Sequence, residues 1–423
     1  MKKIPTTLPD LFSFVRRGLI YRSHKLLDPI LLPLYRRTIP RKVAAMRRTE
    51  HIRVAFVVPE LGVWKTERLF AAMLKHPRFC PQIIVVPATE VPKSADAVLQ
   101  YVQKKGYPYI DLRQRRQSIS KAADPHIVFY QKPYDYSLPN RYNFRQIPGA
   151  LFCFATYGFH TVRLSEVQET SLTEACWQVY FENELTMIES EAVQHRHIGN
   201  NIVTGLPMGD DLSRPLSSYP NPWKEMNDGK RRKRIIWAPH HSVAVEGKTD
   251  IDYSTFLQYA DFMLDMARKT SDTVQWAFKP HPLLRANLEK CWKKEQIDNY
   301  YHLWATLPNT QLELGSYQGL FMHSDAMIHD CSSFIVEYMF TKNPVLYLVK
   351  NDLHRHTLNS FALQAFLLHE HAEESSKIAH FIDDIVAGHD AMKEEREKYY
   401  NEQLMPPGDK TACENIIAAI LGE

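Results

Sequence analysis

The stretch VQWAFKPHP, residues 274–282, places a short apolar run directly before a charged turn. Its first five residues are mostly apolar and aromatic, which is typical of a strand covered on both faces. Two prolines then enclose Lys279 and His281 in the turn that ends the strand. Ligands of parallel α/β folds bind outside the carboxyl ends of the strands, so this turn is a candidate binding site.

Short apolar runs alternate with longer amphipathic segments along most of the chain. Strands are expected at residues 52–58, 82–86, 126–130, 150–155, 179–182, 201–205, 235–239, 274–278, 301–304, 326–329 and 344–349. Helices are expected at residues 64–76, 92–105, 254–270, 284–295 and 332–342. This alternation predicts an α/β protein with two Rossmann-like, doubly wound domains whose parallel sheets face a cleft.

The length of 423 residues also exceeds what one hydrophobic core usually organises. A proline-rich stretch that ends in a charge run separates the two halves and reads as a linker. The predicted parts are a basic helical segment at 1–50, an N-terminal domain at 51–215, a linker at 216–233, a C-terminal domain at 234–385 and C-terminal helices at 386–423.

Cysteine usage and hydropathy indicate a cytoplasmic protein. The six cysteines lie far apart and form no C-x-x-C pair, so we expect reduced thiols and no zinc site of that type. No stretch approaches the roughly 20 apolar residues of a membrane span, and the N-terminus lacks the features of a signal peptide.

The N-terminal segment carries most of the positive charge. Residues 1–50 hold twelve lysines and arginines against three acidic residues, a net charge of +9, which leaves −5 for the rest of a chain whose net charge is +4. Aliphatic residues alternate with these cations, as in segments that lie on an anionic membrane. A helical hairpin packed on the body is one alternative. Nucleic acid is not an expected partner, because the acidic remainder continues no phosphate track.

Three polar clusters directly follow three predicted strands of the second half. They are PHHS at 239–242, KPHP at 279–282 and HDCSS at 329–333. The carboxyl ends of parallel strands share one edge of a sheet, so these clusters should converge on a site for an anion. The candidate residues are His240, His241, Ser242, Lys279, His281, Asp330, Ser332 and Ser333. They include no carboxylate set suited to a metal ion, so we expect no metal and no cofactor to be required.

The third cluster should begin a helix at residue 332. Its first turn would carry the hydroxyl groups of Ser332 and Ser333, and free backbone N–H groups there favour a phosphate. Glu337 lies about one helical turn further on and could accept hydrogen bonds from a ribose. Taken singly, the three clusters have simpler interpretations: a helix N-cap, a proline-bounded connection, or buried hydrogen-bonded histidines.

The order of these motifs resembles a known family. GLPMGD at 205–210, WAPHHS at 237–242, FKPHP at 278–282 and SDAMIHDCSSFIVEYMFTKNPVLYLVKND at 324–352 are similar to the CDP-glycerol glycerophosphotransferase family of teichoic-acid and capsule polymerases. The resemblance covers roughly residues 145–420 and includes the tail YYNEQLMPPGDKTACENIIAAIL at 399–421. It implies a GT-B fold, with an acceptor domain followed by a nucleotide-donor domain that binds a CDP-alcohol.

The resemblance also assigns roles to single residues. Lys279 and His281 match the family's Lys-Pro-His-Pro donor motif, Ser332 and Ser333 match its Asp-Tyr-Ser-Ser motif with Cys331 in place of the tyrosine, and Glu337 matches the acidic residue that follows. The family's histidine base lies in a Trp-His-Gly element. Here the corresponding stretch reads FATYGFHTVR, 154–163, so the role of base falls on His160 of the N-terminal domain.

These assignments predict a transferase that moves glycerol or ribitol phosphate from a CDP-activated donor to a hydroxyl of a membrane-linked glycan or polymer, with release of CMP. His160 would deprotonate the acceptor, while Lys279, His281 and the serines would stabilise the departing CMP. The expected location is cytoplasmic, on the inner face of the plasma membrane through residues 1–50. A GT-B glycosyltransferase that uses a nucleotide sugar is the main alternative; a non-catalytic scaffold and a nucleotide-sugar epimerase are weaker ones.

Overall fold

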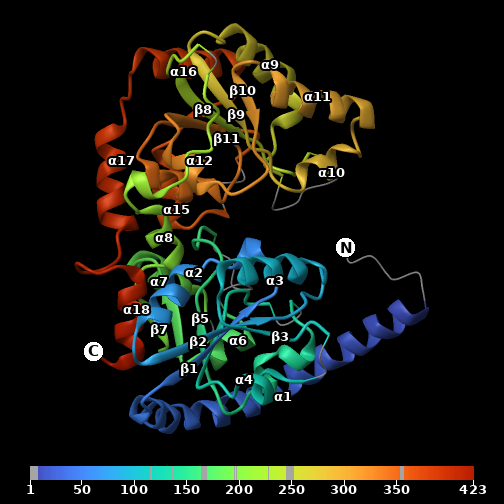
Figure 1. Cartoon of the computed structure of the whole chain (residues 1–423), viewed down its shortest axis with the longest axis vertical. Coiled ribbons are helices and arrows are strands. Elements are labelled where there is room, and N and C mark those ends of the chain that lie inside the picture. The colour runs from blue at the N-terminus through green and yellow to red at the C-terminus, as the bar shows by residue number, and fades with distance from the viewer. Residues whose placement is uncertain are drawn as a thin grey trace. The chain divides into compact units, whose positions relative to one another are not determined.

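The computed structural model describes residues 8–423 except 115–116, 135–136, 163–168, 195, 197, 227, 244–251 and 353–356, with side chains from residue 26 onward (Figure 1). The chain forms two compact units. Unit 1 consists of Met1–Gly158, Leu164–Met208 and Pro406–Glu423, and unit 2 of Phe159–Arg163 and Gly209–Met405. The boundary near residue 208 falls inside the helix α8 (Pro207–Leu212).

Unit 1 is built on a parallel seven-stranded sheet with the order β3-β2-β1-β4-β5-β6-β7. Its strands are β1 (Ile52–Val58), β2 (Phe79–Val85), β3 (Tyr109–Asp111), β4 (Ile127–Tyr130), β5 (Leu151–Phe154), β6 (Gln178–Phe181) and β7 (Asn201–Val203). Its helices are α1 (Leu8–Arg48), α2 (Glu67–Lys75), α3 (Ser94–Lys105), α4 (Ile119–Ala123), α6 (Ser171–Ala175), α7 (Glu184–Val193) and α18 (Ala412–Leu421). Short 3₁₀ turns lie at Leu61–Val63, Asn140–Tyr142 and Phe144–Gln146.

Unit 2 is built on a parallel six-stranded sheet with the order β10-β9-β8-β11-β12-β13. Its strands are β8 (Lys233–Ala238), β9 (Val274–Phe278), β10 (Thr310–Leu312), β11 (Ala326–His329), β12 (Val345–Leu348) and β13 (Glu370–Ala372). Its helices are α9 (Phe256–Lys269), α10 (Leu284–Leu288), α11 (Lys294–Thr306), α12 (Gln318–Met322), α13 (Phe334–Glu337), α15 (Ser360–Leu367), α16 (Ser375–Ala387) and α17 (Lys393–Tyr399). Shorter turns are 3₁₀ at Leu216–Ser218 and Tyr338–Thr341 and π-helical at Tyr400–Leu404.

The prediction of two parallel-sheet domains is confirmed. Interior strands of each sheet carry a buried apolar run, and their side chains pack against aromatic neighbours. Phe56 of β1 stacks on Phe129 of β4 with ring centroids 4.7 Å apart, and Trp237 of β8 stacks on Phe278 of β9 at 5.0 Å. Burial of such large rings is the main favourable contribution to the folding free energy of each unit.

One predicted strand is wrong. Residues 301–304 lie inside α11, and the strand that follows is β10. The buried residues of α11 are Ile297, Tyr300, Tyr301 and Trp304. That spacing of three, one and three is the pattern of a helix with one buried face, so the short apolar run YHLW alone was misleading.

The C-terminal segment is divided between the units. Residues 406–423 belong to unit 1, where α18 packs against α2, and Asn415 donates to the carbonyl of Thr204 at 3.2 Å. The prediction grouped residues 386–423 together and ended the N-terminal domain at residue 215. Chain contacts instead put the observed boundaries near residues 208 and 405.

The predicted basic helical segment forms one helix, α1, of 41 residues (Figure 1). Residues 28–46 of α1 hold it to unit 1 through one face. Tyr35 donates to the carbonyl of Ala150 at 2.8 Å, Arg36 donates to the carbonyl of Glu174 at 2.7 Å, and Asp28 forms an ion pair with Arg145. Across the described part of the chain, no helix combines the length and the apolar character that a bilayer span demands.

Candidate functional site

Three neighbouring strands bring the three polar clusters to one edge of the unit 2 sheet. β8 lies between β9 and β11, so PHHS, KPHP and HDCSS leave the sheet side by side. The backbone N–H of His281 donates to the carbonyl of Pro239 at 3.1 Å and thereby joins the first two loops. Cys331 joins the third through a contact from its Sγ to the carbonyl of Ala238 at 3.3 Å.

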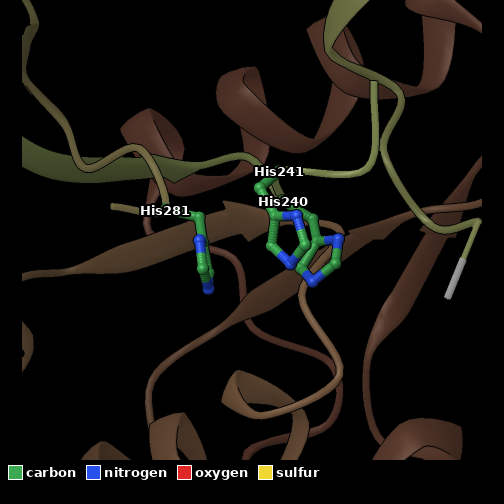
Figure 2. A group of neighbouring side chains, drawn as sticks. All are labelled: His240, His241 and His281. Carbon is green, nitrogen blue, oxygen red and sulfur yellow. The ribbon is translucent and has the colours of Figure 1, made fainter. Parts of the chain in front are cut away.

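Three imidazole rings meet at this edge (Figure 2). The ring centroids of His240 and His241 are 4.2 Å apart, those of His241 and His281 4.3 Å, and those of His240 and His281 5.4 Å. The sequence predicted this convergence from the parallel strands alone. We call these three residues the histidine group.

The buried side chain of Asp330 fixes the positions of the loops at this edge of the sheet. Its side chain is fully buried, and it accepts hydrogen bonds from the backbone N–H of His240 and from the N–H and hydroxyl of Thr255, the latter two at 2.6 and 2.9 Å. Burial raises the pKa of Asp330 to about 6. In the structure Asp330 holds two loops together, and its predicted contact with the substrate stays a prediction.

Lys279 is a nearly buried cation. Its side chain is 7% exposed, and within the described part of the chain its ammonium group makes no ion pair or hydrogen bond. Burial lowers the pKa of Lys279, while the negative charge of Glu313 opposes that shift. A charge that is removed from water without a carboxylate at ion-pair distance is costly, so the position favours an anionic ligand.

The imidazoles of His241 and His281 are neutral at pH 7. Burial lowers the pKa of His281 to about 4, with further contributions from His241 and Lys279. Burial also lowers the pKa of His241. Positive charge at the site therefore comes from Lys279, and the histidines contribute hydrogen bonds.

The third cluster differs from its prediction. A helix was expected over 332–342, but α13 spans only Phe334–Glu337 and is followed by the 3₁₀ turn Tyr338–Thr341. Ser332 is half-buried and Ser333 exposed just before it. Glu337 is 6% exposed and accepts a hydrogen bond from the hydroxyl of Tyr317. Its contact with a ribose stays a prediction.

His160 was predicted as a base supplied by the N-terminal domain. Residues 159–163 group with unit 2 instead. The side-chain amide of Asn359 donates to the carbonyl of His160 at 2.6 Å, and Val162 pairs with Leu358 in an antiparallel bridge. Its role as base remains a prediction.

Sequence reasoning missed residues that support the site from helices and loops. Asn287 of α10 donates to the carbonyl of His241 at 2.9 Å, and Thr255 binds Asp330. The backbone N–H groups of Tyr253 and Ser254 donate to the hydroxyl oxygen of Ser242 at 3.0 and 3.1 Å. These residues lie outside the motifs, and no spacing in the sequence connects them to the clusters.

A cavity of about 530 Å³ lies elsewhere in unit 2. It is bordered by residues that precede β8, β11 and β12, which places it at the opposite edge of the sheet from the histidine group. Two of its cations are already neutralised, since Arg231 binds Asp325 at 3.0 Å and Arg214 lies 3.4 Å from Asp211. A third cation of the lining, Lys342, lies over the ring of Tyr400 at 4.0 Å from its centroid.

Two Rossmann-like parallel-sheet domains, with polar strand ends in the second, give the chain a GT-B fold. The family described as CDP-Glycerol:Poly(glycerophosphate) glycerophosphotransferase matches residues 188–422, more than half of the chain. The chain belongs to this family, as the motifs predicted. It is thus a transferase of the CDP-glycerol glycerophosphotransferase type.

Solved structures show the same fold at low sequence identity. The wall teichoic acid polymerase TagF is 14% identical, with a TM-score of 0.55 and coverage of 96% of each chain. A variant of that polymerase soaked with CDPG gives 12% identity, a TM-score of 0.54 and coverage of 96% of this chain and 97% of that one. UDP-GlcNAc 2-epimerase from Neisseria meningitidis bound to UDP-GlcNAc is 14% identical, with a TM-score of 0.56 and coverage of 88% and 100%. Curated protein sequences give no match.

Proposed function

We propose that this transferase binds the diphosphate of a CDP-polyol at the histidine group and Lys279, and passes the polyol phosphate to a hydroxyl of a lipid-linked acceptor. The observation that carries the proposal is the nearly buried ammonium of Lys279, which forms no ion pair among the described residues and lies near His281 of the histidine group. The fold neighbour soaked with CDPG supports a donor of this kind.

The reaction forms one phosphorus–oxygen bond and breaks another. The acceptor hydroxyl gives its proton to a base, for which His160 is the candidate, and its oxygen attacks the phosphorus that bears the polyol. The bond to the bridging oxygen breaks, and CMP leaves with the electron pair. Lys279 neutralises charge on the departing phosphate, and His241 and His281 donate hydrogen bonds to it. These protein groups supply the stabilisation, so no metal or cofactor is required in this proposal.

CMP release tests the proposal. The full chain is incubated with CDP-glycerol or CDP-ribitol and a lipid-linked acceptor, with UDP-sugars as the competing donors. His281→Ala should abolish turnover, and His302→Ala, which alters an exposed histidine of α11, should not. Unchanged turnover in His281→Ala would overturn the proposal, and release of UDP from a sugar donor would favour a glycosyltransferase.

The outer face of α1 supports a lipid-linked acceptor. Its exposed apolar residues are Leu26, Leu27, Ile30, Leu31 and Leu34. They share one helical face with exposed Arg37 and Arg41, because the spacings keep all of them within about 140° of the helix circumference. The opposite face is occupied by unit 1 through Asp28, Tyr35 and Arg36.

The occupant of this outer face is an anionic bilayer. Leucines alone would suit any apolar partner, but arginines on the same face add attraction to acidic lipid headgroups, about 1 kcal/mol for each cation. The protein is then held at the inner face of the plasma membrane, where a lipid-linked hydroxyl is available. This part of the proposal has its own test in the Discussion.

A further inference from the structure

The three imidazoles of the histidine group have the spacing of a metal site. One ring nitrogen from each can be chosen so that all three lie within 4.8 Å of one another. Whether a metal ion fits depends on which nitrogen of each ring carries the proton, since only an unprotonated nitrogen can be a ligand. The hydrogen bonds to the other nitrogen of each ring answer that question.

His281 is the simplest case. The backbone N–H of Leu283 points at its Nδ1 at 3.1 Å. A backbone N–H can only donate, so Nδ1 must accept. The neutral ring therefore carries its proton on Nε2.

His241 is held in the same state by Asn287. The amide nitrogen of Asn287 lies 3.3 Å from Nδ1 of His241 and donates to the carbonyl of His241 at 2.9 Å. The orientation of the amide is set by Lys290, whose ammonium donates to the amide oxygen at 3.3 Å. Because that oxygen faces a cation, the NH₂ group faces the ring, and the proton of His241 is on Nε2.

His240 is held through Ser242. The hydroxyl oxygen of Ser242 accepts from the backbone N–H groups of Tyr253 and Ser254, so its own proton is directed to another acceptor. That acceptor is Nδ1 of His240, at 2.9 Å. All three rings therefore present Nδ1 as an acceptor and Nε2 as a donor.

We propose that Asn287, Ser242 and the backbone of residue 283 are positioning groups that lock the histidine group as neutral Nε2–H donors, so that it binds a deprotonated diphosphate and excludes divalent metal ions. The identity of the anion as a diphosphate rests on the proposed function; the tautomers and the exclusion of metal do not.

The same contacts oppose protonation. An imidazolium carries protons on both nitrogens, so a second proton on His241 or His281 would meet the donor that already faces Nδ1. At His241 a hydrogen bond to its own backbone acts in the opposite direction and raises the pKa, but burial outweighs it. The charged groups around them act in the same direction, since Lys279 lies near His281 and Lys290 near His241. Asp330 faces the backbone of His240 rather than its ring, and Glu313 acts on Lys279. Burial contributes further, and the pKa of His281 falls to about 4.

Metal binding would demand three simultaneous changes. Each ring would have to move its proton to Nδ1 and give up the hydrogen bond that it accepts there. Metal-binding histidines usually show the reverse pattern, in which the second nitrogen donates to a carbonyl or carboxylate. The spacing of the three nitrogens therefore suggests a metal site, whereas their tautomers favour an anion.

The locked tautomer also decides the role of His281. It was predicted as a donor or as an acid toward the leaving phosphate. A phosphate with a second pKa near 6 leaves readily as an anion at pH 7, so no proton transfer is required. His281 then acts through an Nε2–H hydrogen bond that needs no proton exchange during turnover.

The test replaces Asn287, one of the three positioning groups. In Asn287→Asp a carboxylate faces Nδ1 of His241, which should draw the proton to Nδ1, raise the pKa of the ring and leave the Nε2 lone pair available. The matched control is Asn287→Leu, which has a similar shape and removes the amide without supplying an acceptor. Full-length protein with ¹⁵N-labelled histidine reports the tautomers by long-range proton–nitrogen NMR, and His241→Gln and His281→Gln assign the two signals.

In calorimetry, we expect the wild-type and Asn287→Leu proteins to show no zinc binding that depends on His241 and His281. We expect the wild-type rings to carry their proton on Nε2 at pH 7.5. Asn287→Asp should show an Nδ1–H signal for His241, at least tenfold tighter zinc binding and weaker CDP binding. Zinc bound by the wild type and lost in the His241→Gln, His281→Gln double variant would overturn the inference, as would Nδ1–H tautomers. Failure of the wild type to bind CDP with Nε2–H tautomers in place would instead overturn the proposed function.

Discussion

The backbone N–H of His240 donates to the fully buried carboxylate of Asp330, which ties the end of β8 to the end of β11. In Asp330→Asn, an NH₂ group would replace one acceptor and face a donor from His240 or Thr255. We expect the free energy of unfolding in urea at pH 7 to fall by about 1–3 kcal/mol. Asp261→Asn, on the exposed face of α9, is the control and should change it little. Equal stability of the two variants would show that Asp330 is no anchor.

The lowered pKa of His281 predicts a pH dependence of stability. The ring stays neutral in the folded protein down to a pH of about 4, whereas in the unfolded chain it takes up a proton below its ordinary pKa of 6.5. The unfolded state therefore binds more protons between pH 4 and 6.5, so stability falls as the pH falls through this window. His281→Gln should have a shallower slope there than the wild type. Parallel curves of unfolding free energy against pH would contradict the shift.

The same property predicts the pH profile of turnover. If His281 acts as a neutral donor, kcat/KM for CMP release should change with pH between 7.5 and 6 in the same way in the wild type and in His281→Gln. The glutamine of this variant is a donor that carries no charge at any pH. A limb near pH 6.5 that disappears in His281→Gln would indicate that the ring titrates during catalysis.

Which parts of the fold and site the sequence could predict depended on the kind of interaction that forms them. β9 and its turn were predictable because five buried residues and two prolines are local features, and the convergence of the loops followed from parallel strands. Asn287 was not predictable, because it reaches His241 from α10, forty-six positions away in the sequence. The edge strands β3 and β13 were missed because three residues with partly exposed side chains carry too little periodicity.

Replacing two outer residues of α1 tests the membrane surface. Ile30→Glu with Leu34→Glu removes apolar area and adds repulsion from acidic lipids, while the inner face of the helix is untouched. We expect at least tenfold weaker binding to phosphatidylglycerol vesicles in flotation assays, unchanged circular dichroism, and wild-type binding that weakens with salt. Leu367→Glu, at an exposed leucine of α15, is the control. Equal binding to neutral phosphatidylcholine vesicles would argue against a role for the arginines.

Gly205 is a position where a side chain is not tolerated. Its φ is +77°, and an added Cβ would lie 2.9 Å from the Cβ atoms of Ala412 and Pro406. Gly205→Ala should therefore lower the free energy of unfolding by about 1–3 kcal/mol through backbone strain and the close contact with the C-terminal segment. Gly62→Ala, with open space around the added atom, is the control. Equal unfolding of both variants would mean that residues 406–423 can move away without cost.

Lys279 should show opposite effects on stability and binding. In the free protein its ammonium is nearly buried and forms no ion pair among the described residues, and only the more distant charge of Glu313 favours it, so Lys279→Met should raise the free energy of unfolding by about 1 kcal/mol. With donor bound, the same change removes a charge-assisted contact to the diphosphate and should weaken CDP binding about 10- to 100-fold. Calorimetry with CDP and urea unfolding without it measure the two effects, and Lys377→Met is an exposed control. A purely structural lysine would lower stability when replaced and leave the affinity for CDP unchanged, because its contribution would lie within the folded protein rather than with the ligand.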